Sequence, residues 1–162
     1  LTWWAHYGLS EAVDRLGSRD QRRSVDQTHA LTANLTFKPS PKWTIVGLWT
    51  FHTGWPTTPL TAQEVTAADG STTIEATPGP RNSERFAAYT RLDAQVRRIF
   101  RLDRGNLNVF FGVNNLTDRQ NACCVQRFDF APRPDGTVEV QRNEGFWQEL
   151  VPQFGVIWEF LK

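Results

Sequence analysis

Methionine is absent from all 162 residues of this sequence. A complete translated chain begins with methionine, and a secreted precursor begins with a basic segment followed by an apolar one. This sequence opens on Leu1-Thr2-Trp3-Trp4 and has neither feature. We therefore expect it to be a piece, or a trimmed form, of a longer protein.

Long hydrophobic runs are also missing. The longest nearly apolar stretch covers about residues 43–51 and is interrupted by Thr44, Gly47 and Thr50. A membrane-spanning helix needs roughly 18 consecutive apolar residues or more. The sequence therefore predicts no transmembrane helix.

Neither sign of charge dominates, and no catalytic string is present. With 18 basic and 17 acidic residues the formal net charge is +1, which is too small for the positive field of a nucleic-acid-binding protein. No Gly-x-Ser-x-Gly or His-Glu-x-x-His string occurs, and nothing fixes two carboxylates at a catalytic distance. We expect neither nucleic-acid binding nor enzymatic activity.

Histidine and cysteine are scarce. His6, His29 and His52 fall one to a predicted strand, and none has the close second ligand of a typical zinc site, so no metal or cofactor is expected. The only cysteines are neighbours, Cys123 and Cys124, a spacing that fits neither a disulfide framework nor a Cys-x-x-Cys site. We expect one on each face of a strand, the alternative being a strained vicinal disulfide.

What is present is a strong alternation of apolar and polar residues. Leu107, Val109, Phe111 and Val113 alternate with mainly polar residues, and the segments 91–102, 31–37 and 153–160 follow the same rule. This period of two predicts strands with one apolar face. Arg98 is the only charge on the apolar side of segment 91–102, and we expect it near the end of its strand.

The alternation predicts an all-β chain of six long antiparallel strands. Their approximate ranges are 1–11, 26–38, 42–53, 87–101, 105–130 and 137–161. The turns at 39–41 and 103–105 are tight, whereas the connections over 12–25 and 54–86 are long and polar. Asp135-Gly136 predicts a hairpin within the last part of the chain.

Long strands with tight turns at one end and long loops at the other are typical of an outer-membrane β-barrel. In such a barrel the apolar face contacts lipid and the polar face lines a wet lumen. The residues predicted to face the lumen are Arg91, Asp93, Gln95, Arg97, Asn106 and Asn108. The alternatives are a half-solvated antiparallel sheet and, for the charged row, a cross-strand charge ladder.

Several strings, in order along the chain, resemble the C-terminal end of TonB-dependent outer-membrane receptors. Segment 91–96 (RLDAQV) resembles the strand that enters the last hairpin, and segment 107–121 is similar to the family's alternating strand ending in Asn-Leu-x-Asp. Segment 152–160 resembles the closing strand with its terminal aromatic residue, although Leu161 and Lys162 follow it here. Segment 52–56 (HTGWP) occurs in a subset of such receptors.

The resemblance implies that residues 1–162 form the C-terminal part of an up-and-down transmembrane barrel of about 22 strands, with short periplasmic turns and long extracellular loops. Such a receptor lies in the outer membrane of a Gram-negative bacterium. Driven by the TonB complex, it takes up a scarce nutrient such as a ferric siderophore, cobalamin or an oligosaccharide. The plug domain and the segment that contacts TonB are not in this sequence.

Ligand contacts in such a receptor are expected from the outward loops, because loops carry function on a rigid scaffold. The aromatic and cationic candidates are Trp55, Arg81, Arg127, Arg133 and Trp147. Each has the alternative of being a solvated loop residue. Two other functions stay open, namely a soluble all-β module that binds carbohydrate or another ligand, and a passive porin.

Overall fold

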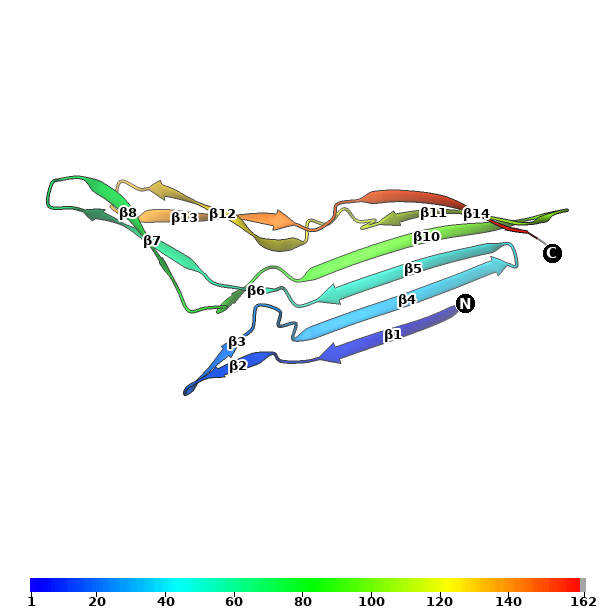
Figure 1. The fold of residues 1–162 in the computed structure, drawn as a ribbon, viewed down its shortest axis with the longest axis horizontal. Coiled ribbons are helices and arrows are strands. Elements are labelled where there is room, and N and C mark those ends of the chain that lie inside the picture. The colour runs from blue at the N-terminus through cyan, green and yellow to red at the C-terminus, as the bar shows by residue number, and fades with distance from the viewer. Residues whose placement is uncertain (161–162) are drawn as a thin grey trace.

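The computed structural model describes residues 1–160 and is entirely made of antiparallel sheets and their connections. Leu161 and Lys162, which follow the terminal aromatic residue, lie outside the described residues. Six strands form the main sheet: β1 (Thr2–Leu9), β4 (His29–Ser40), β5 (Trp43–His52), β10 (Tyr89–Leu102), β11 (Gly105–Asn114) and β14 (Val151–Phe160). They lie side by side in that order, so each strand pairs with the next long strand along the chain (Figure 1).

The remaining strands form four small two-stranded units beyond one end of this sheet (Figure 1). They are β2 (Val13–Leu16) with β3 (Arg19–Arg22), β6 (Pro56–Thr57) with β9 (Glu84–Arg85), β7 (Leu60–Thr66) with β8 (Thr72–Pro78), and β12 (Ala122–Pro132) with β13 (Val138–Phe146). We call this the hairpin end. The opposite, short-turn end carries the two tight turns, which join β4 to β5 and β10 to β11. Among the described residues no helix is long and apolar enough to span a membrane.

Two of the predicted strands are wrong in extent. The range 105–130 divides into β11 and β12, and 137–161 divides into β13 and β14. The first break lies where Asn115 and Asp118 adopt positive φ values of 51° and 48°. Asn and Asp tolerate this left-handed region better than other side chains, so the backbone turns out of the extended conformation there.

The predicted Asp135-Gly136 hairpin is confirmed. Its loop is a three-residue one in which the Gly136 amide donates to the Arg133 carbonyl at 3.0 Å and only Gly136 has a positive φ, 80°. A hydrogen bond of the same kind runs from Gly70 to Ala67 in the β7–β8 hairpin, inside the connection predicted as a plain loop. Asp69-Gly70 is the sequence signal that would have predicted this second hairpin.

One face of the main sheet is apolar across all six strands. The register pairs Trp49 with Leu92, Val96 with Ile45, and Phe111 with Phe154, and residues paired across strands share a face. The apolar face consists of Trp3, Ala5, Tyr7, Leu31, Ala33, Leu35, Phe37, Trp43, Ile45, Trp49, Phe51, Leu92, Ala94, Val96, Phe100, Leu107, Val109, Phe111, Val113, Phe154, Val156, Trp158 and Phe160.

Little of this apolar surface is covered. Among the described residues only Phe86 and Ala122 are buried hydrophobic side chains, whereas Phe154 is 81% exposed and Phe111 is 55% exposed. Within residues 1–160 no second layer packs against the sheet, and β1 and β14 are its edge strands (Figure 1). The usual hydrophobic core of a domain is therefore replaced by an exposed apolar face.

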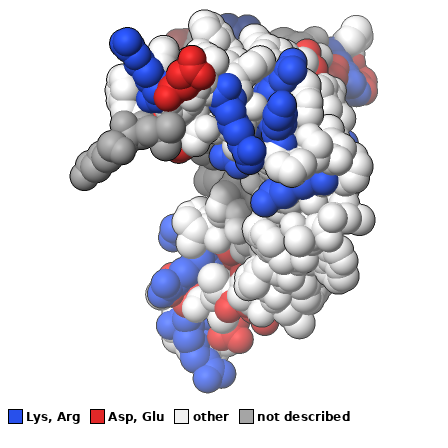
Figure 2. Space-filling view, turned by 90° about the vertical axis from the view of Figure 1, so that its right-hand side faces the viewer, with Lys and Arg blue, Asp and Glu red and all other residues white. Residues whose placement is uncertain are grey.

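Arg98 is the charged residue on the apolar face, and it lies at the short-turn end. It pairs in register with Trp43, the first residue of β5. Its guanidinium carbon lies 5.0 Å from the centre of the Trp43 ring and 4.5 Å from that of Phe100. Viewed from this end, several basic side chains and a few acidic ones stand at the top, a mixed acidic and basic group lies at the lower left, and a broad uncharged area lies at the right (Figure 2).

Candidate ligand-facing site at the hairpin end

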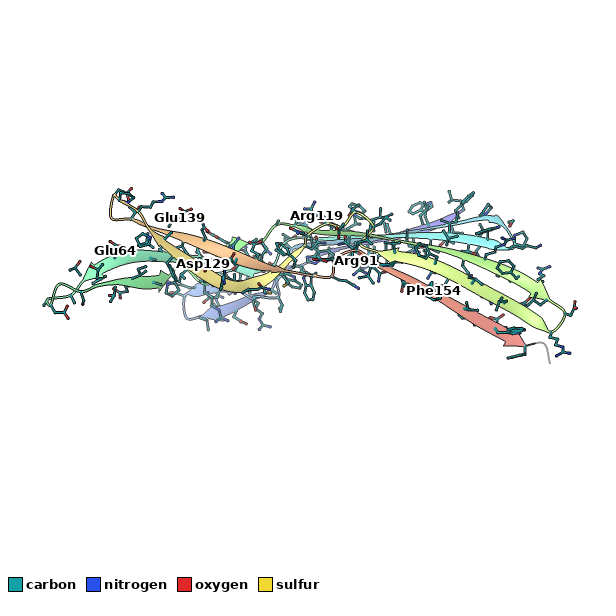
Figure 3. The ribbon with its side chains drawn as sticks, turned by 90° about the horizontal axis from the view of Figure 1, so that it is seen from above. Glu64, Arg91, Arg119, Asp129, Glu139 and Phe154 are labelled. Atoms are coloured by element: carbon teal, nitrogen blue, oxygen red, sulfur yellow. The ribbon has the colours of Figure 1, made fainter. Side chains whose placement is uncertain are left out.

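The candidate site begins where the main sheet ends and the hairpins start. Arg91 and Arg119 lie near this junction, whereas Phe154 lies on the sheet and Glu64, Asp129 and Glu139 lie on the hairpins (Figure 3). The six residues predicted to face a lumen, Arg91, Asp93, Gln95, Arg97, Asn106 and Asn108, all lie on the face of the sheet opposite the apolar face.

The Arg-Leu-Asp and Asn-Leu-Thr-Asp strings meet at the junction. Asp93 accepts the Asn115 backbone amide at 2.9 Å through Oδ1, and its Oδ2 pairs with the Arg91 guanidinium at 2.6 Å. One carboxylate therefore fixes the start of the hairpin region and orients a cation on the polar face.

The Asn115 side chain is completely buried and makes three hydrogen bonds. Its Nδ2 donates to the carbonyls of Arg119 at 3.0 Å and Gln148 at 3.1 Å, while its Oδ1 accepts the Arg119 amide at 3.1 Å. Asp118 accepts the Leu150 amide at 2.9 Å. The string thus ties the end of β11 to the segment that leads into β14.

Asn121 extends the pairing of β10 beyond the main sheet. Its Oδ1 accepts the Thr90 amide at 2.9 Å and its Nδ2 donates to the Thr90 carbonyl at 3.0 Å. The Trp147 amide donates to the Asn121 carbonyl at 2.8 Å. A single amide side chain therefore imitates the two backbone bonds of a strand partner, at a point where β11 has already turned away.

Asp26 and Arg85 form a buried ion pair that joins two connections. The Asp26 side chain is 0% exposed; it accepts the Ala12 amide at 2.6 Å and contacts the Arg85 guanidinium. Arg85 also donates to the carbonyls of Asp26 at 3.0 Å and Gly54 at 2.8 Å. Burial opposes ionisation of Asp26, but the Ala12 amide and Arg85 outweigh it and keep the Asp26 pKa below its ordinary value.

Gly54 permits a close backbone crossing beside this pair. A Cβ atom at Gly54 would lie only 1.9 Å from the Phe86 carbonyl oxygen, which no real side chain allows. At this crossing the Phe86 amide donates to the Trp55 carbonyl at 3.0 Å. Trp55 and Phe86 both line a cavity of about 420 Å³. We call this cavity the aromatic groove; its lining includes Trp55, Phe86, Cys123, Cys124 and Trp147.

A second cavity, of about 490 Å³, adjoins the aromatic groove and is lined largely by charged and polar residues. Arg81 lies here, and its carbonyl accepts a hydrogen bond from Gln21 Nε2 at 3.1 Å. Asn82 borders both cavities. Among the residues described, the Arg22 Nε is a buried side-chain nitrogen with no hydrogen-bond partner, although it lies 3.5 Å from the Asp26 carboxylate.

The five ligand candidates are thus only partly brought together. Trp55 and Trp147 line one groove, and Arg81 lies in the adjoining cavity. Arg127 and Arg133 lie on the β12–β13 hairpin, where they pair with Asp129 at 3.2 Å and Glu139 at 2.9 Å. Asp26, Arg85 and Asn121 were not predicted, because a single polar residue in a loop carries no periodic signal.

The three histidines do not form one group. His29 Nδ1 hydrogen-bonds the Tyr7 hydroxyl at 2.8 Å, whereas the His52 ring stacks on Tyr89 with 4.5 Å between ring centres. His6 pairs in register with Thr32, on the face opposite the apolar face. Within residues 1–160 no group of three or more His, Cys, Asp or Glu side chains is placed to hold a metal ion.

Cys123 and Cys124 depart from the expected placement on opposite faces. A bulge between Ala122 and Cys124 leaves Cys123 without a register partner, while Cys124 pairs with Gly145. A Cβ atom at Gly145 would lie 2.9 Å from Cys124 Sγ and 3.2 Å from Cys123 Sγ. The bulge interrupts the alternation of side chains, so both sulfur atoms lie over the same glycine, and both thiols are free.

Comparison with known proteins gives no assignment. No protein-family model, no curated protein and no solved structure matches this chain.

Proposed function

We propose that this chain is the C-terminal barrel wall of a TonB-dependent receptor in the outer membrane of a Gram-negative bacterium. The apolar face contacts outer-membrane lipid, and the opposite face lines a lumen occupied by a plug domain. The hairpins gather a scarce nutrient such as a ferric siderophore, cobalamin or an oligosaccharide. The TonB complex drives its uptake through the part of the protein that carries the plug.

The observation that carries this proposal is the uncovered apolar face. An exposed apolar patch of this extent requires a partner, and among the described residues no second layer provides one. A soluble half-solvated sheet would pack this face against helices or another sheet. Hydrocarbon is a partner that covers all six strands without any protein layer.

Strand length and aromatic placement support a membrane setting. The ten residues of β5 extend about 33 Å at roughly 3.3 Å per residue. At a tilt of about 40° this matches the apolar band of about 25 Å in outer-membrane barrels. Phe37 and Trp43 lie near the short-turn end and Tyr7 and Phe51 near the hairpin end, as expected for two interfacial aromatic girdles.

The position of Arg98 supports an orientation in which the short-turn end faces the periplasm. On a lipid-facing surface an arginine costs about 2–4 kcal/mol at the midplane and about 0–1 kcal/mol near the interface. Arg98 lies at the short-turn end over Trp43 and Phe100, where its guanidinium reaches headgroup phosphates. The short-turn end then faces the periplasm, and the hairpins, the aromatic groove and the adjoining cavity face outward.

Spin labels on neighbouring positions of β10 test the lipid contact. Val96 lies on the apolar face and Arg97 on the opposite face, and both are exposed. In the full-length protein with Cys123 and Cys124 replaced by serine, a nitroxide at V96C should collide mainly with oxygen dissolved in the bilayer. A nitroxide at R97C should collide mainly with a water-soluble nickel chelate. Equal access of both labels to the chelate would favour the soluble binding module.

Energy coupling needs a separate experiment. Uptake is measured with cells expressing the full-length protein and a panel of iron-loaded siderophores, cyanocobalamin and maltodextrins, with and without a functional TonB. A receptor should accumulate at least one of these compounds only when TonB is present. Uptake that persists without TonB would favour the passive porin.

A further inference from the structure

The sulfur atoms of Cys123 and Cys124 lie beside one another through a feature of the backbone. In a regular strand adjacent side chains point to opposite faces. Here the bulge and the absence of a side chain at Gly145 allow both sulfurs to lie within 3.2 Å of the position that a Cβ atom would occupy. The pair is therefore arranged as a dithiol whose two sulfurs open on one side of the hairpin.

The surroundings of this dithiol are uncharged. The aromatic groove contains no Asp, Glu, Lys or Arg, and its large side chains are Trp55, Phe86 and Trp147. The hydrogen bond to Cys124 and burial together raise the pKa of the Cys123 thiol. Hard cations that prefer oxygen ligands have no carboxylate here, whereas thiols favour soft elements.

The number of ligands limits the choice of soft element. Structural zinc needs four ligands, and the described residues offer no group of three at this place. A trivalent arsenical carrying one organic group needs only two thiolates to complete its bonding. The organic group would then lie against the aromatic side chains of the same groove.

We propose that Cys123 and Cys124 form a dithiol site for trivalent organoarsenicals, with the organic group held in the aromatic groove. Each sulfur forms a bond to arsenic and releases its proton, and the arsenical oxygen leaves as water with those two protons. Arsenic stays trivalent, so the step needs neither oxidant nor reductant. This inference is independent of the proposed transport function, since it concerns binding to the hairpin end alone.

Phenylarsine oxide is the probe for this site. The full-length protein is reduced, freed of reductant in detergent micelles and titrated, with binding followed by intact mass and by tryptophan fluorescence. We expect one phenylarsenic group per protein, removed by a small dithiol and resistant to an equal concentration of a monothiol. C123S and C124S should each weaken binding at least a hundredfold, because a single thiolate cannot chelate.

Gly145→Ala is the matched variant that keeps both thiols. Its methyl group would occupy the space shared by the two sulfurs, and Gly145 has no positive φ, so the backbone accepts alanine. We expect at least tenfold weaker binding of phenylarsine oxide, with two thiols still titrated by a disulfide reagent. Wild-type binding by G145A, or binding by C123S as tight as that of the wild type, would overturn the proposal.

Trp147→Phe tests the part played by the groove. It should weaken phenylarsine oxide more than arsenite, which has no organic group to bury. Equal effects on both probes, or none, would show that the organic group does not lie in the groove and would overturn that half of the proposal.

Discussion

At the scale of single residues, polar side chains hold the hairpin end together. Asp26 and Asn115 are the largest completely buried side chains among the described residues, and both act as connectors between segments. Such groups are stable only when their hydrogen bonds are satisfied, and here they are. Substitutions at these positions should therefore loosen the candidate site before they affect the main sheet.

Asp26→Asn should open the connection between β1 and β4. The substitution leaves Arg85 beside a neutral amide, and breaking a buried ion pair costs roughly 3 kcal/mol or more. Hydrogen exchange of the amides in 12–28 should then be about a hundredfold faster. Asp14→Asn, which removes an exposed pair with Arg23, is the control and should change exchange little. Equal exchange in both variants would contradict a structural role for Asp26.

The same pair predicts a pH dependence. Because the pKa of Asp26 in the folded protein is below its ordinary value, its ionised form adds stability at and above the usual aspartate range near pH 4. That contribution is lost as the pH falls through the folded pKa. Protection of segment 12–28 should hold from pH 7 down to about 4 and decline below it, whereas D26N should show no such decline.

Gly54→Ala should displace the loop that carries Trp55. The added methyl group would meet the backbone of Phe86, which cannot move aside as a flexible side chain would. Limited proteolysis should cut the 53–60 segment much faster in this variant. Gly47→Ala is the control, because a Cβ atom there has nothing within 4 Å, and its cleavage should match that of the wild type.

At the scale of elements, the hairpins continue the main sheet through side chains as well as backbone. Asn121 pairs with both polar atoms of the Thr90 backbone, and Asp93 holds the turn at Asn115. These contacts lie at the break between β11 and β12, and those of Asn115 with Gln148 and of Asp118 with Leu150 lie at the break between β13 and β14. After the division, the first part of β12 and Trp147, which follows β13, line the aromatic groove.

Asn121→Ala should separate the start of β12 from β10. The Thr90 amide and carbonyl lose their partners, at a cost of about 1–3 kcal/mol for each group that stays buried. The fluorescence of Trp147, whose amide bonds Asn121, should shift to longer wavelength as the groove opens. Asn114→Ala, which removes one 3.3 Å contact with Gln153, is the control. An unchanged spectrum in N121A would argue against this role of the side chain.

At the scale of the whole molecule, the sheet depends on surroundings that it does not itself supply. Two open edges offer unpaired backbone groups, and one face is apolar over six strands. Edges of this kind pair with other chains unless they are covered. In a larger barrel the neighbouring strands would cover both edges, and lipid would cover the face.

Residues 1–162 expressed alone should therefore aggregate in buffer. Analytical ultracentrifugation should show large species without detergent and much smaller ones in a micelle-forming detergent. Far-ultraviolet circular dichroism should report β-structure in the detergent sample. A stable, monomeric β-sheet protein in plain buffer would contradict both this expectation and the proposed membrane setting.

The sequence by itself determined the faces and the ends of the main sheet. Side chains alternate along a strand for steric reasons, so the period of two assigned Arg91, Asp93, Gln95, Arg97, Asn106 and Asn108 to one face. The tight turns predicted at 39–41 and 103–105, which contain Pro and Gly, indicated which end of the sheet has short connections. Within the ranges predicted for the main sheet, the breaks between β11 and β12 and between β13 and β14 were not predicted, because apolar and β-branched residues occur on both sides of each break.

Only the tertiary structure decided what the hairpin end contains. Asp26 and Arg85 form an ion pair, and Trp55 and Trp147 line one groove, because segments that are distant in the sequence come together there. No local pattern encodes such a meeting. The bulge at Cys123 interrupts the alternation of side chains found in the other strands, so the sulfur atoms of Cys123 and Cys124 lie over the same glycine. Local sterics set which way a strand residue points, whereas the packing of distant segments sets which loop residues share a site.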